Sequence, residues 1–245
     1  SYPLLVTLMY KIKSYYFIDN NQPATILYLH GWGCNYKYLL PFDKCTSITN
    51  HLFIDLPAFG KNEPIKTPLT LTDFANITIS FIELKKLNIK AILGHSFGGK
   101  IAVLIAQKLD IKLLFLIAPS IYNKKRSLFF HIKIIIYKLF KSLNFNKRIL
   151  SKFGSKTYRT LSAPMKKTMI NVINEDITEQ LESTKSSFIM FFSNKDKIIP
   201  YYLSKKIKKH TEDCIVYKIK GDHFAYFYNI AFISNIIEKV VEYKL

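Results

Sequence analysis

Cysteine is scarce in this chain of 245 residues, and long apolar runs are absent. The three cysteines, Cys34, Cys45 and Cys214, are an odd number and lack the spacing of metal ligands, which excludes a disulfide-stabilised scaffold. No run approaches the ~20 apolar residues of a membrane-spanning helix, and residues 1–6 lack the basic start of a signal peptide. We therefore expect a cytoplasmic protein that uses no metal and no other cofactor.

Acidic residues are also few, because 17 Asp and Glu stand against 36 Lys and Arg, for a net charge of +19. Such a charge favours nucleic acid or an anionic membrane as a partner. However, Lys, Ile, Asn, Tyr and Phe are abundant together, as a coding bias would produce, and the chain has no nucleic-acid-binding motif. We therefore expect no nucleic-acid partner and leave open a weak association with an anionic membrane surface.

The length and the apolar fraction of 49% suffice for a single domain, residues 1–245, with a full hydrophobic core. Short apolar runs typical of strands alternate with segments of helical periodicity. The expected strands are Met9–Ile18, Thr25–Leu29, His51–Ile54, Ala91–Leu93, Leu113–Ala118, Ser187–Phe192 and Ile215–Lys220. The expected helices cover residues 36–44, 70–87, 101–109, 203–210 and 224–243. This alternation predicts an α/β fold with a doubly wound, mainly parallel sheet.

The alternation stops after Pro119. From residue 120 to residue 186 the signals are helical, so we expect a helical insertion into the sheet. Within it, residues 127–141 are apolar with lysines at intervals. Two interpretations stay open: a cap helix whose apolar side covers the site, or an interfacial helix that binds anionic lipid.

One stretch, Ala91–Lys100, carries a chemical signature. Its Gly94-His95-Ser96-Phe97-Gly98 follows an apolar run and precedes a helix, which is the strand–turn–helix context of a nucleophile elbow. The two glycines leave room at a sharp turn where a Cβ would strike neighbouring elements. Ser96 then lies near a helix N-terminus, which stabilises developing negative charge. We expect Ser96 to be a nucleophile; the alternative is a glycine-rich turn with an incidental serine.

A serine nucleophile needs a base within hydrogen-bond reach and a third group that orients the base. Three histidines follow Ser96 in the chain. His131 lies in the insertion and His210 ends a lysine-rich helix, whereas His223 directly follows the last expected strand. We therefore expect His223 to be the base; the alternative is a surface loop histidine.

The orienting acid should follow an earlier strand at the same edge of the sheet. Asp196 does so, shortly after the strand that ends at Phe192. Asp213 precedes the last strand, and Asp222 adjoins His223, where neighbours in an extended loop rarely face each other. We expect Asp196 to orient the base; the alternative is an ordinary aspartate in a turn.

Two backbone N–H groups are expected to hold the oxyanion that forms during acyl transfer. One belongs to Phe97, at the start of the helix after the nucleophile, and the other to Trp32, in the loop after the second expected strand. The alternative for Trp32 is an aromatic side chain packed under that loop. The expected substrate pocket comprises His30, Gly31, Trp32, His95 and Phe97.

Together these motifs resemble the α/β-hydrolase fold family, in the group with a helical cap. The matching residues, in the family's order, are His30–Gly33, Asp55–Gly60, Gly94–Gly99, Asp196 with Pro200, and His223–Phe224. The resemblance implies a Ser96–His223–Asp196 triad and a cap between the sixth and seventh strands. Residues 153–159 and 172–176 also resemble cap segments of some bacterial members, whereas Ala58 stands where the family usually has glycine.

The resemblance implies an esterase-like serine hydrolase that forms an acyl-enzyme on a small carboxylic ester or related acyl compound. One alternative is a ligand-binding or signalling member that hydrolyses slowly or not at all. Another is a membrane-interface lipid hydrolase that uses the basic insertion.

Overall fold

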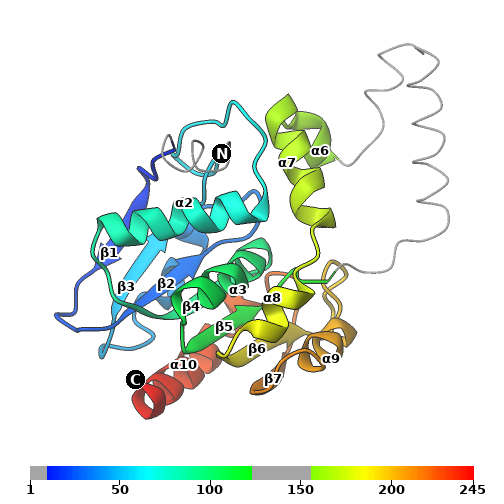
Figure 1. Cartoon of the computed structure of the whole chain (residues 1–245). Helices are drawn as coiled ribbons and strands as arrows, with labels where there is room; N and C mark the ends of the chain where they lie inside the picture. The colour runs from blue at the N-terminus through cyan, green and yellow to red at the C-terminus, as the bar shows by residue number, and fades with distance from the viewer. Residues whose placement is uncertain (1–9, 123–155) are drawn as a thin grey trace, which may run out of the picture.

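The structure is a computed structural model that describes residues 10–122 and 156–245 (Figure 1). In this part of the chain, one seven-stranded sheet has the order β1-β3-β2-β4-β5-β6-β7. The strands are β1 (Tyr15–Ile18), β2 (Thr25–Leu29), β3 (Asn50–Ile54), β4 (Ile89–His95), β5 (Leu113–Ile117), β6 (Ser187–Ser193) and β7 (Cys214–Ile219). β1 pairs antiparallel with β3, and the other neighbouring strands are parallel. The expected mainly parallel sheet is confirmed.

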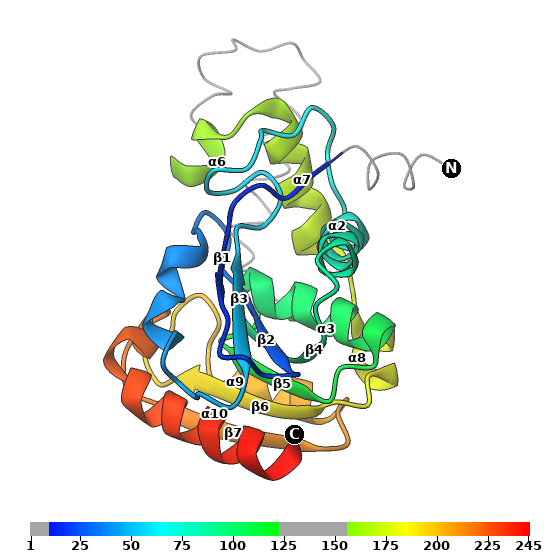
Figure 2. The same cartoon turned by 90° about the vertical axis from the view of Figure 1, so that its left-hand side faces the viewer.

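Both faces of the sheet are covered by helices (Figures 1 and 2). Along β2, Leu27 and Leu29 belong to one hydrophobic core, and Ile26 and Tyr28 belong to the other. The helices that contribute to the first core are α2 (Leu71–Leu84), α3 (Phe97–Leu109), α7 (Ala163–Asn174), α8 (Thr178–Ser183) and α9 (Tyr202–Lys208). Helix α10 (Ile230–Lys244) packs against the second. The sheet is therefore doubly wound, and the loops at the carboxyl ends of its parallel strands share one edge.

The helix expected over residues 36–44 is instead two short 3₁₀ helices, η1 (Tyr36–Tyr38) and η2 (Leu40–Phe42). Pro41 lies inside the second of them. Because proline has no N–H to donate and clashes with the preceding turn, an α-helix cannot run through this position.

The first strand begins later than expected, at Tyr15. Ahead of it, the backbone N–H of Lys13 is donated to the side chain of Asn62 (2.8 Å) and not to a neighbouring strand. Residue 9, where the expected strand began, lies outside the described residues.

The closing helix also begins later than expected. A 3₁₀ helix, η3 (Ala225–Tyr228), precedes α10, and Asn229 separates the two. The Asn229 side chain donates to the carbonyl of Lys220 (3.0 Å), which ties this turn to the loop after β7. Among the residues described, no helix combines the length and the apolar character needed to cross a membrane.

The insertion between β5 and β6 is helical where the structure describes it. It contains α6 (Lys156–Thr160), α7 (Ala163–Asn174) and α8, whereas residues 127–141 lie outside the described part of the chain. Counted among the described strands, the insertion follows the fifth. Helices α6 and α7 stand off the sheet, while α8 packs on α3 (Figure 1). We propose that α6 and α7 are the described part of a cap within residues 120–186 of the single domain.

Candidate active site

Ser96 lies at a sharp turn between β4 and α3. Its backbone angles, φ 52° and ψ −111°, fall in a region that L-residues rarely adopt. The N–H of Ser96 is donated to the carbonyl of Ile117 (2.9 Å), and its own carbonyl accepts from the N–H of Ser120 (3.0 Å). These bonds to β5 and the segment after it hold the strained turn in place.

Glycine is needed on both sides of this turn. A Cβ on Gly94 would lie 2.6 Å from the Cα of Gly99, and a Cβ on Gly98 would lie 2.1 Å from the carbonyl oxygen of Leu29. Both obstacles are backbone atoms of packed elements, so they cannot move aside as a flexible side chain could. The spacing of the two glycines thus follows from how closely α3 approaches β2 and β4.

The structure brings Ser96, His223 and Asp196 into one hydrogen-bonded chain. His223 Nε2 lies 3.1 Å from Ser96 Oγ, and His223 Nδ1 lies 2.7 Å from Asp196 Oδ2. The three residues follow β4, β6 and β7, so the shared carboxyl edge of the sheet joins groups that are 127 and 27 residues apart. Ser96 is 9% exposed and the His223 side chain 11% exposed, so the pair is shielded from bulk water without being sealed off.

The Asp196 carboxylate is enclosed, with its side chain 0% exposed. Its Oδ1 accepts hydrogen bonds from the backbone N–H groups of Ile198 (2.7 Å) and Ile199 (2.9 Å). Burial alone raises the pKa of this carboxyl, but the bonds from His223 and from the two N–H groups outweigh it and lower the pKa. An ionised Asp196 accepts a hydrogen bond from Nδ1–H of His223, which leaves Nε2 free to accept a proton from Ser96.

His95 lies behind His223 and is 1% exposed. Its Nε2 is 3.1 Å from the carbonyl oxygen of His223, so this nitrogen carries the proton and donates it. Burial lowers the pKa of His95 to about 3, which keeps the ring neutral. His95 was expected in the substrate pocket, but the structure uses its ring to support the His223 loop.

His30 has a similar structural role in the loop after β2. Its Nδ1 donates to the carbonyl of Gly31 (2.8 Å), and its Nε2 accepts from the N–H of Leu56 (2.9 Å). Burial lowers the pKa of His30 to about 4, in agreement with this neutral tautomer. Both ring nitrogens therefore join two loops of the protein, which differs from the pocket role expected for His30.

The two expected oxyanion donors adjoin Ser96. Gly31 approaches so closely that a Cβ on it would lie 3.5 Å from the Ser96 Cβ, which brings the loop with Trp32 against the serine. Among the described residues, the backbone N–H groups of Trp32 and Phe97 have no acceptor. Two unpaired donors beside a hydroxyl suit an anion that forms on a substrate.

The Trp32 ring packs against the buried rings of Phe97 and Phe59. The Trp32 ring lies edge-on, 5.2 Å from the Phe97 ring and 5.0 Å from the Phe59 ring. Phe59 comes from the Asp55–Gly60 turn, to which the sequence assigned no role in the pocket, because the direction of its ring depends on the folded turn. The Trp32 ring is therefore packed under its loop, and its place in the substrate pocket stays a prediction.

A doubly wound, mainly parallel sheet with a serine at a strained elbow, and a histidine and an aspartate at the same edge, defines the class of α/β hydrolases. Among the described residues, no group of three or more His, Cys, Asp or Glu side chains could hold a metal ion. The sequence model of the alpha/beta hydrolase family matches residues 26–209. The chain belongs to this family, as its resemblance implied.

Two curated relatives are each named "Putative esterase/lipase 2". The protein from Mycoplasma genitalium is 34% identical over 125 residues, and the match covers 46% of this chain and 46% of the relative. The protein from Mycoplasma pneumoniae is 30% identical over 122 residues, with the same two coverages of 46%. The chain thus spans about half the length of the curated relatives it matches.

Solved structures share the fold over most of the chain. A lipase-esterase related protein from Clostridium acetobutylicum has a TM-score of 0.68 at 23% identity, covering 91% of this chain and 97% of that one. An esterase from Exiguobacterium antarcticum has a TM-score of 0.70 at 15% identity, covering 96% of this chain and 99% of that one. At these identities the likeness establishes the fold.

Proposed function

We propose that this protein is a serine hydrolase that cleaves carboxylic esters through an acyl-enzyme. The observation that carries the proposal is the hydrogen-bonded chain from Asp196 through His223 to Ser96, with distances of 2.7 and 3.1 Å. The esterase names of the two Mycoplasma relatives support the same class of substrate.

In the first half of the proposed reaction, Ser96 Oγ attacks the ester carbonyl carbon while His223 Nε2 takes its proton. Asp196 stabilises the imidazolium that forms, because its carboxylate accepts from Nδ1–H at 2.7 Å. The N–H groups of Trp32 and Phe97 donate to the carbonyl oxygen as it becomes an oxyanion. Removing one such donor typically raises the barrier by about 2.7–4 kcal/mol.

In the second half, the tetrahedral intermediate collapses and His223 gives the proton to the departing alcohol oxygen. A water molecule then takes the place of the alcohol, and His223 removes its proton as the water attacks the acyl-enzyme. The acid product leaves and Ser96 regains its proton. The neutral ring of His95 holds the backbone of His223 and takes no proton itself, since burial lowers its pKa to about 3.

The proposed substrate is a small ester with a modestly hydrophobic acyl or alcohol part. The partly exposed Trp32 ring, backed by the buried rings of Phe59 and Phe97, offers an apolar surface in the loop next to the serine, and apolar groups gain free energy by leaving water for such a surface. A panel of p-nitrophenyl esters of rising acyl length measures this preference. We expect kcat/KM to rise with chain length to a maximum, whereas a flat profile would argue against an apolar pocket.

A fluorophosphonate probe tests the nucleophile directly. We expect it to label the wild type and to spare Ser96→Ala. The matched control is Ser204→Ala in α9, which removes another buried hydroxyl, one that donates to the carbonyl of Tyr201 (2.7 Å). Unchanged labelling of Ser96→Ala would refute the assignment of the nucleophile.

The competing function is a ligand-binding or signalling protein that hydrolyses slowly or not at all. An unlabelled, folded wild type that also leaves every p-nitrophenyl ester intact would favour it. The cytoplasmic location expected from the sequence stays a prediction.

A further inference from the structure

The rings of Tyr38, Phe224 and Phe227 lie together beside His223, and Tyr228 follows Phe227 in η3; we call these four side chains the aromatic rim. The Tyr38 ring centroid lies 6.2 Å from those of Phe224 and Phe227, which are 6.4 Å from each other. Tyr38 is 40%, Phe227 39% and Tyr228 84% exposed. Contiguous exposed aromatic area of this kind marks a surface that meets another molecule or a membrane.

Four exposed lysines flank the aromatic rim: Lys37, Lys195, Lys197 and Lys220. The turn with Lys195 is bonded to the loop after β7, because its N–H is donated to the carbonyl of Gly221 (3.1 Å). Lys220 is held next to the rim, because its carbonyl accepts from the side chain of Asn229 (3.0 Å), which follows Tyr228. The aromatic and cationic side chains thus share one small region of the surface.

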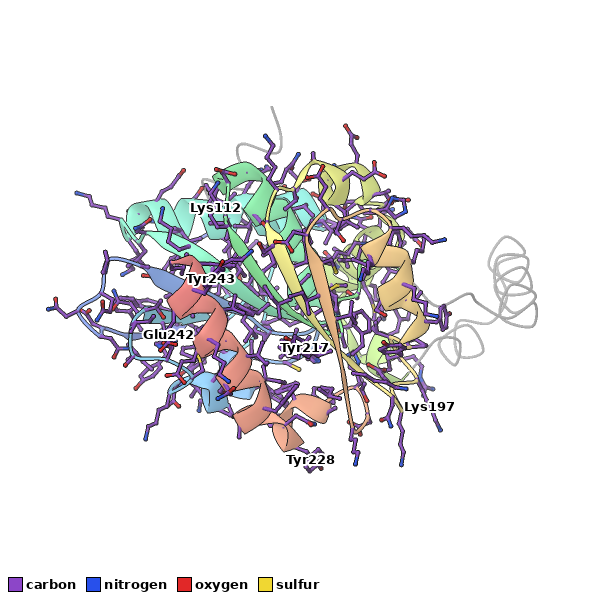
Figure 3. All side chains as sticks on the ribbon, turned by 90° about the horizontal axis from the view of Figure 1, so that it is seen from below. Lys112, Lys197, Tyr217, Tyr228, Glu242 and Tyr243 are labelled. Atoms are coloured by element: carbon purple, nitrogen blue, oxygen red, sulfur yellow. The ribbon has the colours of Figure 1, made fainter. Side chains whose placement is uncertain are left out.

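Acidic side chains do little to offset these lysines. In the described segments that carry the rim and its lysines, the exposed carboxylate belongs to Asp222. The Asp196 carboxylate is enclosed beside His223 and adds no charge to the surface. Tyr228 and Lys197 both project from the same edge of the molecule, at the bottom of Figure 3. The region therefore combines exposed rings with an excess of positive charge.

We propose that the aromatic rim binds the surface of an anionic phospholipid bilayer. Tyrosine and phenylalanine rings insert into the boundary between headgroups and acyl chains, where an apolar body and a polar tip are both satisfied. Lysines bury their stems along such a surface while their ammonium groups meet anionic headgroups. The net charge of +19 attracts the whole chain to the same surface.

A second copy of the chain fits this surface poorly. In a two-fold dimer the same patch would face itself, so each rim lysine would meet lysines of the other copy without an acidic partner.

Single-stranded nucleic acid also fits poorly, because bases stack on free aromatic faces. The Phe227 ring instead stacks against Phe224 and lies 4.4 Å from the Tyr226 ring, so its faces are partly covered.

The position of the rim has a consequence that rests on the proposed ester hydrolysis. Phe224 directly follows His223, with ring centroids 5.5 Å apart, so a bilayer bound to the rim would lie next to Ser96. Esters that partition into the membrane would then reach the serine without crossing much water. Binding and hydrolysis are separate measurements, so either can fail without the other.

The experiment is co-sedimentation with vesicles of phosphatidylcholine alone or mixed with phosphatidylglycerol, at low and high salt. The full chain is compared with a rim variant, Phe227→Ser with Tyr228→Ser, and with Tyr243→Ser as the matched control. Tyr243 is 86% exposed and lies at the other end of α10 (Figure 3). Far-UV circular dichroism verifies that each variant is folded.

At low salt, we expect the wild type to bind the anionic vesicles at least about tenfold better than vesicles of phosphatidylcholine alone. We expect the rim variant to bind the anionic vesicles at least about fivefold worse than the wild type does. Tyr243→Ser should stay within about twofold of wild type. Lys195→Gln with Lys220→Gln should weaken binding to anionic vesicles by about tenfold or more. Lys112→Gln with Lys185→Gln, exposed lysines near the amino ends of β5 and β6, should change it little.

Three results would overturn the proposal. The first is wild type that does not bind anionic vesicles at low salt, and the second is a folded rim variant that binds them as well as wild type. The third is evidence that the rim binds a different partner. In that case the rim substitutions would abolish a dimer seen by light scattering, or a complex with a single-stranded oligonucleotide, while binding to vesicles persists.

Discussion

Lys100 Nζ lies 2.6 Å from the carbonyl oxygen of Glu175 and donates to it. The same ammonium donates to the carbonyl of Val172 (2.9 Å), so one side chain from the first turn of α3 holds the last turn of α7. Lys100 is 2% exposed, and burial lowers its pKa to about 8. The helix that carries the elbow is thereby joined directly to the helices that stand off the sheet.

Removing this link should destabilise the fold. In Lys100→Met, the methionine side chain has a volume similar to that of lysine but leaves the carbonyls of Val172 and Glu175 without a donor. We expect a loss of about 2 kcal/mol in the free energy of unfolding. Urea unfolding measures it. Lys108→Met, at an exposed lysine of the same helix, should change stability by less than about 0.5 kcal/mol. Equal effects of the two substitutions would contradict the structural role of Lys100.

Asp196→Asn should abolish most activity without loosening the loop. The amide oxygen can still accept from the N–H groups of Ile198 and Ile199, but the amide nitrogen would face His223 Nδ1 and favour the wrong tautomer. We expect kcat to fall by about 10⁴-fold, measured on a p-nitrophenyl ester, with the unfolding midpoint nearly unchanged. Asp222→Asn is the matched control in the neighbouring loop, and a comparable fall in that variant would argue against Asp196 as the orienting acid.

Acid should destabilise the protein through His95 and His30. Burial lowers their pKa values to about 3 and about 4, while an unfolded histidine titrates near the ordinary value of 6.5. Between these values the unfolded chain binds protons that the folded chain does not, so the free energy of unfolding falls as the pH falls. We expect each group to contribute about 2 kcal/mol of loss between pH 7 and pH 5.

Urea unfolding at several pH values checks this expectation. His95→Gln retains a side-chain N–H for the carbonyl of His223 but has no group that titrates in this range. We expect it to remove about 2 kcal/mol of the acid-induced loss, the share of His95. Equal stability of the wild type at pH 7 and pH 5 would show that the two rings are not held neutral in the folded chain.

Ala58→Gly should stabilise the fold. Ala58 has φ 68°, in the left-handed region that disfavours any residue with a Cβ. Relief of that strain outweighs the extra chain entropy of glycine, for a gain of about 0.5–1 kcal/mol in thermal or urea unfolding. Ala75→Gly, within α2, should act in the opposite direction by about 1 kcal/mol. A loss of stability in Ala58→Gly would contradict this account.

Local patterns were enough to predict the order of the elements and the elbow. The apolar runs at Thr25–Leu29 and Leu113–Ala118 became β2 and β5, and the helix expected from residue 70 is α2, which begins with a capping box of Thr70 and Asp73. Such features depend on neighbours within a few residues, which the sequence displays directly. The prediction of one α-helix over residues 36–44 was wrong, because the apolar periodicity there was given more weight than Pro41, which an α-helix cannot pass through.

The sequence by itself determined the fold class and the chemical types available at the edge of the sheet, because strand and helix periodicity, glycine spacing and hydroxyl, imidazole and carboxyl groups are properties of the chain. Only the tertiary structure decided which of these groups meet. The contact of Ser96 with His223 spans 127 residues. His95 and His30 were expected to line the pocket, but their ring nitrogens bond to backbone groups of other loops, and only the folded chain decides where those partners lie. Hydrogen bonds act over about 3 Å, so their pairing follows from the packing of distant strands and cannot be read from neighbours in the chain.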